Sequence, residues 1–115
     1  MATVTTQVVN NAIDKAAEEA QKILDDAKAK CDQINAETAA KVQKQKEDGY
    51  ALADKMVEEE KNPLKKIAAK KIAEEAKKKV DAQCEKTKAD GEAQCAKQME
   101  EAKAKAAAKA AESKK

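Results

Sequence analysis

Uncharged residues recur through the first half of the chain at steps of four, four and three, and this spacing constrains the fold more than any other feature. From Ala16 to Met56, 16 of 41 residues are Asp, Glu or Lys, yet no member of the series is charged. Eleven residues in three turns give about 3.67 residues per turn, close to the α-helical value, so the series predicts one uncharged face of a long helix. The members are Ala16, Ala20, Ile23, Ala27, Cys31, Ile34, Thr38, Val42, Gln45, Gly49, Ala53 and Met56.

A second uncharged series has the same period in the other half of the chain. The repeat is visible in the similar segments DAQCEKTKADG (81–91) and EAQCAKQMEEA (92–102). A heptad repeat, the alternative, meets Lys41, Asp48 and Lys55 in the first half, so the eleven-residue period describes the chain better. We call the two series together the packing stripe. The second series consists of Ala69, Ala73, Ala76, Val80, Cys84, Thr87, Gly91, Cys95, Gln98, Ala102 and Ala106.

The only proline divides the two series. Asn is a favoured N-cap and Pro a favoured first helical residue, so Asn62-Pro63 predicts the start of a helix and the end of the one before it. We therefore expect a single helical domain over 1–115, with a helix at about 5–61, a turn at about 61–63, a helix at about 63–111 and a frayed tail at 112–115.

The two series match when the chain is folded back at this turn. In an antiparallel pair the numbers of facing residues have a constant sum, and members of the two series pair at sums of 126 or 125. The sequence thus predicts an all-α, coiled-coil-like antiparallel hairpin that dimerises to a four-helix bundle, while a kinked extended rod stays open as the alternative. The pairs are Ala20–Ala106, Cys31–Cys95, Val42–Cys84, Ala53–Ala73, Ile34–Gly91, Gly49–Ala76 and Met56–Ala69.

Composition narrows the classes of partner. Charged residues make up 40% of the 115, the net charge is +2, and residues 1–62 carry −4 against +6 for 63–115. Every basic residue is Lys, and Tyr50 is the only aromatic residue, so the chain lacks the Arg forks and stacking rings that nucleic acids require, and we expect no nucleic-acid binding. The longest charge-free run, 2–13, is too short for a membrane span and does not read as a signal peptide, which makes the cytoplasm the default location.

The three cysteines raise the question of a metal or redox site. No two are spaced as Cys-x-x-Cys and the chain has no His, so we expect no metal site and no cofactor. Cys31, Cys84 and Cys95 all belong to the packing stripe, which favours a packing role. A disulfide between Cys31 and Cys95 in an oxidising compartment stays open, as do a crosslink between chains and a reactive thiol. With no His and one Ser, Ser113, the chain offers no acid–base or nucleophile arrangement, so we expect no enzyme.

The repeats DAQCEKTKADG and EAQCAKQMEEA, with KILDDAKAKCD in the first half, resemble the eleven-residue repeats of group 3 late-embryogenesis-abundant proteins. Their period is also similar to that of the right-handed coiled coils in peripheral-stalk subunits of rotary ATPases. The first resemblance implies a protectant that folds on drying, and the second implies a structural coiled coil. The central NPL departs from an uninterrupted stalk helix.

These patterns favour a non-enzymatic structural or interaction module. We expect the hairpin to self-associate, or to dock on another helical protein, through the Ala/Cys-rich packing stripe. The alternative is an amphipathic membrane-surface or stress-protective helix. Its lysine-rich segments 65–79 and 103–115 would contact anionic membranes, weakly because the stripe is mostly Ala.

Overall fold

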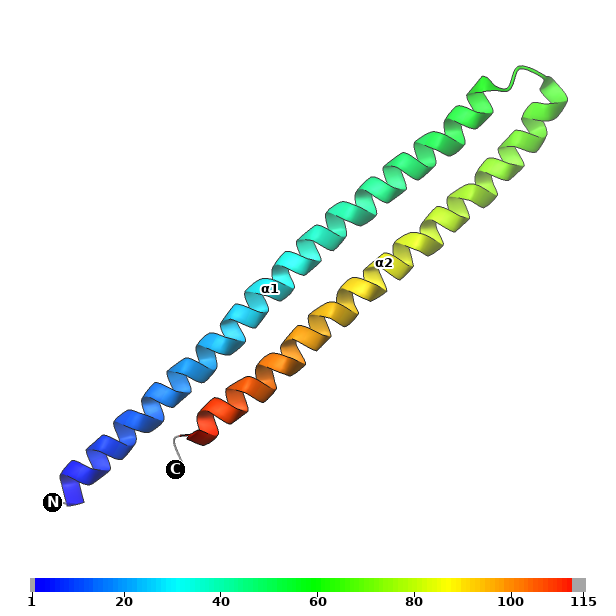
Figure 1. The fold of residues 1–115 in the computed structure, drawn as a ribbon. Helices are drawn as coiled ribbons and strands as arrows, with labels where there is room; N and C mark the ends of the chain where they lie inside the picture. Colours follow the sequence, from blue (N-terminus) through cyan, green and yellow to red (C-terminus); the bar gives the residue numbers. More distant parts are fainter. Residues whose placement is uncertain (1, 113–115) are drawn as a thin grey trace. The chain divides into compact units, whose positions relative to one another are not determined.

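The computed structural model describes the backbone of residues 2–112 and the side chains of residues 8–112. Two helices form this part of the chain: α1 spans Ala2–Glu59 and α2 spans Pro63–Glu112. The second helix returns antiparallel beside the first, and the described residues contain no strand (Figure 1). The predicted all-α hairpin is therefore confirmed, and the kinked rod is not formed.

Both helices are composed of strong helix formers. Ala, Lys, Glu and Gln dominate their sequences, and these residues lose little free energy in a helix. Side chains four residues apart also contact each other, as where Gln43 Nε2 donates to Glu47 Oε1 at 2.7 Å and where Lys55 Nζ lies 3.8 Å from Glu59 Oε1. Such contacts each add a few tenths of a kcal/mol, ~0.2–0.5 in isolated helices, and they keep the outward surface helical in water.

The turn consists of Glu60, Lys61 and Asn62. Glu60 N donates to Val57 O at 3.3 Å, a short-range bond that ends α1 at Glu59, two residues before the expected end near 61. Asn62 Oδ1 accepts from the backbone N of Leu64 at 3.0 Å and of Lys65 at 3.3 Å, so Asn62 caps α2 as the sequence indicated. Pro63 is the first residue of α2, where its missing N–H costs nothing.

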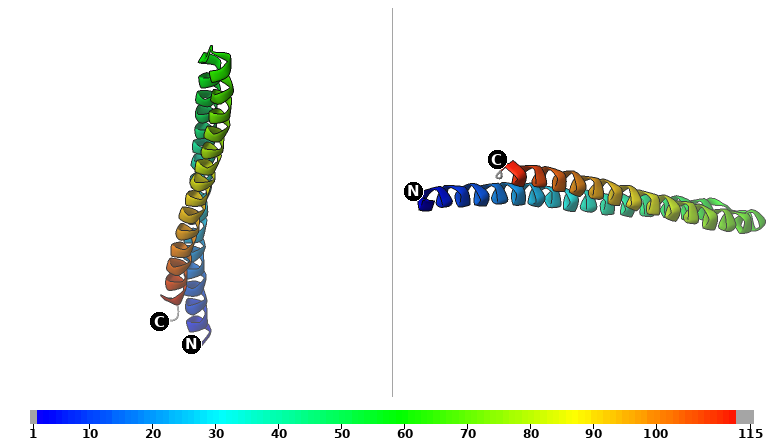
Figure 2. Two further views of the ribbon diagram at one scale, coloured as in Figure 1. Left: turned by 90° about the vertical axis from the view of Figure 1, so that its right-hand side faces the viewer. Right: turned by 90° about the horizontal axis from the view of Figure 1, so that it is seen from below.

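Contacts group the chain into two compact units, each containing part of both helices. The terminal unit is Met1–Ile34 with Ala93–Lys115, and the turn unit is Asn35–Glu92. In an antiparallel pair each residue meets only the few residues opposite it, which explains why the expected single domain groups into smaller sets of contacts. Within each unit the two helices run next to each other, seen as separate ribbons in Figure 1 and largely overlapping in the turned views of Figure 2.

The core of each unit is a line of small residues between the helices. Ala27, Ala102 and Ala106 are buried in the terminal unit, whereas Ala53, Ala69, Ala73, Cys84 and Gly91 are buried in the turn unit. No side chain larger than Cys is buried among the described residues. Small side chains let two helices approach closely, but each buries little apolar area, so no single contact dominates the stability.

Candidate interaction surfaces

The packing stripe lies between the two helices. Every member proposed as a packing residue is buried or half-buried except Met56. The face that the sequence offered for docking is therefore filled, within each unit, by the other helix of the same chain. The buried members are Ala27, Ala53, Ala69, Ala73, Cys84, Gly91, Ala102 and Ala106, and the half-buried members are Ala16, Ala20, Ile23, Cys31, Ile34, Thr38, Val42, Gln45, Gly49, Ala76, Val80, Thr87, Cys95 and Gln98.

Met56 was wrongly placed on the stripe. It is 40% exposed, and its neighbour Val57 is half-buried instead. The strict period takes a step of three after Ala53, whereas the helix pair takes a step of four at this point. With a constant sum of 126, Val57 rather than Met56 faces Ala69. A one-residue error of this kind rotates a side chain by about 100° around the helix and moves it from the interface to the surface.

The two glycines are places where a large side chain of the opposite helix fits. A Cβ atom added to Gly49 would lie 2.5 Å from Val80 Cγ2, and one added to Gly91 would lie 2.6 Å from Thr38 Oγ1. Gly49 therefore lies closest to Val80 rather than to Ala76, the partner expected at a sum of 125. Gly at these positions allows Val80 and Thr38 to sit against the opposite backbone.

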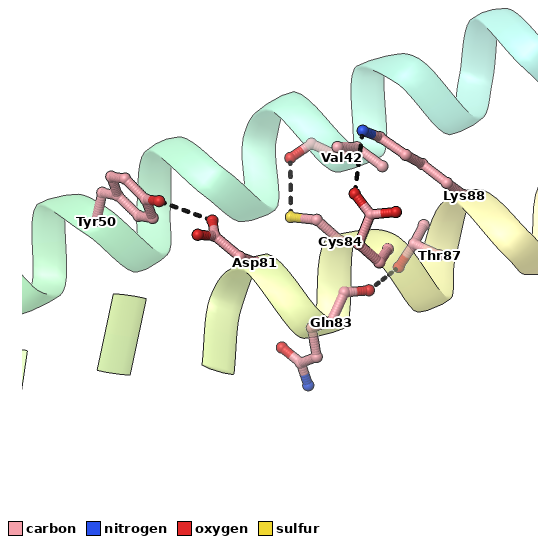
Figure 3. Close-up of polar contacts among 8 residues, drawn as sticks. Val42, Tyr50, Asp81, Gln83, Cys84, Thr87 and Lys88 are labelled. Atoms are coloured by element: carbon pink, nitrogen blue, oxygen red, sulfur yellow. Dashed lines mark hydrogen bonds and ion pairs between the residues drawn. The ribbon is translucent and has the colours of Figure 1, made fainter. Parts of the chain in front are cut away.

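Two of the cysteines are joined. Cys31 on α1 and Cys95 on α2 form a disulfide, and their Cα atoms lie 4.9 Å apart, within the range that a disulfide needs. The third thiol, Cys84, is buried and its Sγ donates to Val42 O at 3.7 Å (Figure 3). The hairpin register thus brings Cys31 to Cys95 and leaves Cys84 as a packing residue.

One polar contact that the stripe did not indicate crosses the turn unit. The Tyr50 hydroxyl on α1 donates to Asp81 Oδ1 on α2 at 2.7 Å (Figure 3). This hydrogen bond, together with partial burial and the nearby negative charge, raises the pKa of Tyr50 above its ordinary value. Lys46 and Lys77 lie 5.7 Å and 5.3 Å from the centre of the Tyr50 ring. Tyr50 directly follows the stripe residue Gly49, and Asp81 directly follows the stripe residue Val80. This position next to the stripe is the sequence signal from which the contact could have been predicted.

Two ion pairs also join the helices. Lys77 Nζ lies 2.7 Å from Asp54 Oδ1 in the turn unit, and Lys109 Nζ lies 3.5 Å from Glu19 Oε2 in the terminal unit. The neighbouring carboxylates, Glu112 first and then Glu19, raise the pKa of Lys109. The four side chains of these two pairs are 34–59% exposed, so solvent screens the ion pairs, and they help to fix the register more than they stabilise the fold.

The outward surface is mostly charged, with large apolar side chains exposed at the start of α1, at Val8, Val9 and Ile13, and near the turn. Several large apolar side chains of the turn unit are exposed, among them Leu52 at 70%, Leu64 at 79%, Ile67 at 67% and Ile72 at 54%. Large apolar groups gathered on an otherwise charged surface are typical of an interaction site. They lie outside the packing stripe, which is why the uncharged period did not single them out.

No chemical centre accompanies these surfaces in residues 8–112. No group of three or more metal-binding side chains is found there, and every buried side-chain nitrogen or oxygen in that range has a hydrogen-bond partner. Neither helix, over its described length, has a stretch apolar enough to cross a membrane. A shallow depression of about 190 Å³ beside Ile23 and Gln98 is bordered by side chains of both charges.

Comparison with known proteins adds no relationship: no family model, curated protein or solved structure matches this chain.

Proposed function

We propose that this chain is a non-enzymatic structural and interaction module whose working part is the helical hairpin. The observation that carries the proposal is the separation of its two kinds of apolar residue. The small residues of the packing stripe are used inside the hairpin, while several large ones remain exposed beside the turn. A chain arranged in this way presents a preformed helical surface, which suits a partner that is itself helical.

The partner is a second copy of this chain or another helical protein. Docking through the packing stripe would require the two helices to separate, because each half of the stripe covers the other. The exposed apolar groups of the turn unit are available without that cost. Self-association through the outward surface is therefore the form of the proposal that the geometry favours.

Sedimentation velocity of the full chain over a wide range of concentrations tests whether the chain self-associates. We expect strong helicity by circular dichroism in plain buffer and a weight-average mass that rises with concentration. A chain that is helical but monomeric throughout would remove self-association and leave docking on a different protein. A chain without helicity in buffer would overturn the proposal as a whole.

A second candidate is an amphipathic surface for anionic membranes or for protection during drying. The observation in its favour is that Leu64 and Ile67 are highly exposed at the start of α2, with lysines at 65, 66, 70 and 71 around them. This function predicts binding to vesicles that contain phosphatidylserine and none to phosphatidylcholine vesicles, read by co-sedimentation. Equal retention by both, or by neither, would remove the membrane form.

A further inference from the structure

Contacts in the turn unit define the two sides of its helix pair. Tyr50 touches Asp81, and Asp54 touches Lys77. Each of these four residues directly follows a buried or half-buried stripe residue on its own helix. Residues that follow an interface position thus lie on one side of the pair, and by helix geometry those that precede an interface position lie on the other side.

Four uncharged residues lie together on that other side. On α1, Leu52 and Met56 precede Ala53 and Val57, and on α2 the exposed Ala68 and Ile72 precede Ala69 and Ala73. At the register given by Val42 and Cys84, whose numbers sum to 126, Ile72 lies two residues along the helix from the level of Leu52, and Ala68 two residues from the level of Met56, an offset of about 3 Å. Because nothing in the turn unit covers this side, the four residues form one exposed apolar surface, which we call the turn patch: Leu52, Met56, Ala68 and Ile72.

The charges at the ends of the turn patch differ between the two helices. On α1, Asp48 and Glu59 continue the row of Leu52 and Met56, at steps of four and three residues. On α2, Lys65 and Lys79 flank the row of Ala68 and Ile72. All four charged residues are exposed. The α1 row is therefore bounded by acids, whereas the α2 row has Lys65 at one end and, beyond Glu75, Lys79 at the other. Glu75, also on the α2 row, lies between Lys71 and Lys79 of its own helix, one turn from each.

We propose that the turn patch is the contact surface of a symmetric dimer of this chain. A two-fold axis along the helix direction sets the α1 row of one copy against the α2 row of the other. Leu52 then meets Ile72 of the second copy, Glu59 meets Lys65 of the second copy, and Asp48 meets Lys79 of the second copy. Each α1 lies antiparallel to two α2 helices, so the four helices of the two turn units pack as a bundle.

The turn patch is complementary in charge to a second copy of itself, and this identifies a second copy of the chain as the partner that covers it. The row with acids at its ends and the row with Lys65 and Lys79 at its ends belong to one surface and lie within about 3 Å of the same level, so one symmetry operation brings each row to the other in both copies. This inference rests on the proposed function, because it assigns self-association to named residues. The apolar area is modest, and the dimer is accordingly weak and dependent on concentration.

Replacement of the apolar residues tests the surface. In sedimentation equilibrium of the full chain, Leu52→Gln and Ile72→Gln are each expected to raise the dimer Kd about tenfold or more, because Gln keeps the helix but removes the buried apolar area. Ile67→Gln is the matched control, since Ile67 is even more exposed than Ile72, at 67% against 54%, but by helix geometry lies on the outer face of α2, and it should leave Kd unchanged. Circular dichroism checks that each variant keeps its helicity.

Reversal of the charges tests the symmetry and does not depend on the apolar variants. Asp48→Lys and Lys79→Glu are each expected to weaken self-association, because like charges then face each other twice in every dimer. An equimolar mixture of the two variants should restore dimers, since each mutated residue then meets an opposite charge in the other chain.

The outcomes separate the dimer from the proposed function. Dimers that form with unchanged Kd in Leu52→Gln and Ile72→Gln would overturn the turn patch and leave self-association standing. A mixture that associates no better than either charge variant would overturn the two-fold arrangement. A wild-type chain that is monomeric at every concentration would overturn both the dimer and self-association, whatever partner the hairpin has.

Discussion

At the scale of single residues, two glycines set how closely the helices of the turn unit approach. Gly in the interior of a helix costs about 1 kcal/mol relative to Ala, so a glycine at such a position needs a compensating contact. Here the compensation is the fit of Val80 against Gly49 and of Thr38 against Gly91. Val and Thr are stiff at χ1, so neither can easily turn away from an added methyl group.

Gly49→Ala should therefore fail to stabilise the protein. Helix propensity alone would add about 1 kcal/mol, but the new methyl group collides with Val80, and we expect a net loss of about 1–3 kcal/mol in the free energy of unfolding. Urea unfolding followed by circular dichroism measures it. The double variant with Val80→Ala should be at least as stable as Val80→Ala alone. A higher midpoint for Gly49→Ala in the wild-type background would contradict this packing.

Tyr50 reports the contact between the helices, because it is the only aromatic residue. Its pKa is raised chiefly by the hydrogen bond to Asp81. Asp81→Asn should bring the pKa of Tyr50 back toward its ordinary value, as seen in an absorbance titration of the phenol. Asp90→Asn, an exposed change elsewhere on α2, should leave the titration as it is. Equal titrations in the wild type and in Asp81→Asn would show that the contact is absent in solution.

The raised pKa of Tyr50 also determines how the stability of the fold changes with pH. A phenol whose pKa is higher in the folded than in the unfolded chain stabilises the fold fully below the unfolded pKa, and this contribution is lost as the pH rises through the folded pKa. Relative to Tyr50→Phe, the wild type should therefore lose stability at alkaline pH, above the ordinary pKa of tyrosine. Thermal unfolding of the two proteins across that range measures the difference.

At the scale of elements, the periodic residues made the helix pair predictable, and the departures from them have local causes. The uncharged positions predicted almost all of the interface residues, because residues at this spacing lie on one face of an α-helix. Met56 was misplaced because a strict eleven-residue period puts the next interface residue three positions after Ala53, whereas the helix pair puts it four positions after, at Val57. The contact between Tyr50 and Asp81 was missed because both residues lie beside the stripe, where polar side chains reach across only at a particular register. The turn was located to within two residues from Asn62-Pro63 alone.

Asn62 is the residue on which the start of α2 depends. Asn62→Ala removes the oxygen that accepts from Leu64 N and Lys65 N and is expected to cost about 1 kcal/mol in the free energy of unfolding. Asn62→Ser keeps a capping oxygen and should cost much less. Urea unfolding at neutral pH compares them. Equal losses in the Ala and Ser variants would mean that capping by the side chain contributes little.

At the scale of the whole molecule, the disulfide is the only covalent link between the helices of the described residues apart from the backbone of the turn. The register that places Cys31 opposite Cys95 followed from the sequence, because both belong to the packing stripe. Whether two facing thiols are oxidised depends on their surroundings, which no residue pattern records. A disulfide also fits poorly with the default expectation of a cytoplasmic protein, since cytosolic thiols are generally kept reduced.

Reduction of this disulfide should destabilise the hairpin. The bond closes a loop with a sequence separation of 64, for which the chain-entropy model gives about 4 kcal/mol of stabilisation. Thermal or urea unfolding with and without dithiothreitol measures the loss. Cys31→Ser should make stability independent of the reductant, whereas Cys84→Ser should keep the dependence. A wild type with the same midpoint in both conditions would contradict the link.

The disulfide also has a mechanical consequence. The start of α1 and the end of α2 both belong to the terminal unit, so a pull between them would peel α2 away from α1 from that end. The peeling would stop at Cys31 and Cys95, where the tension passes directly across the sulfur bridge. The intervening chain, which contains the turn and the turn patch, would bear no force. Under load the oxidised protein thus behaves as a short tether that carries a protected loop, and reduction would convert it into a long one.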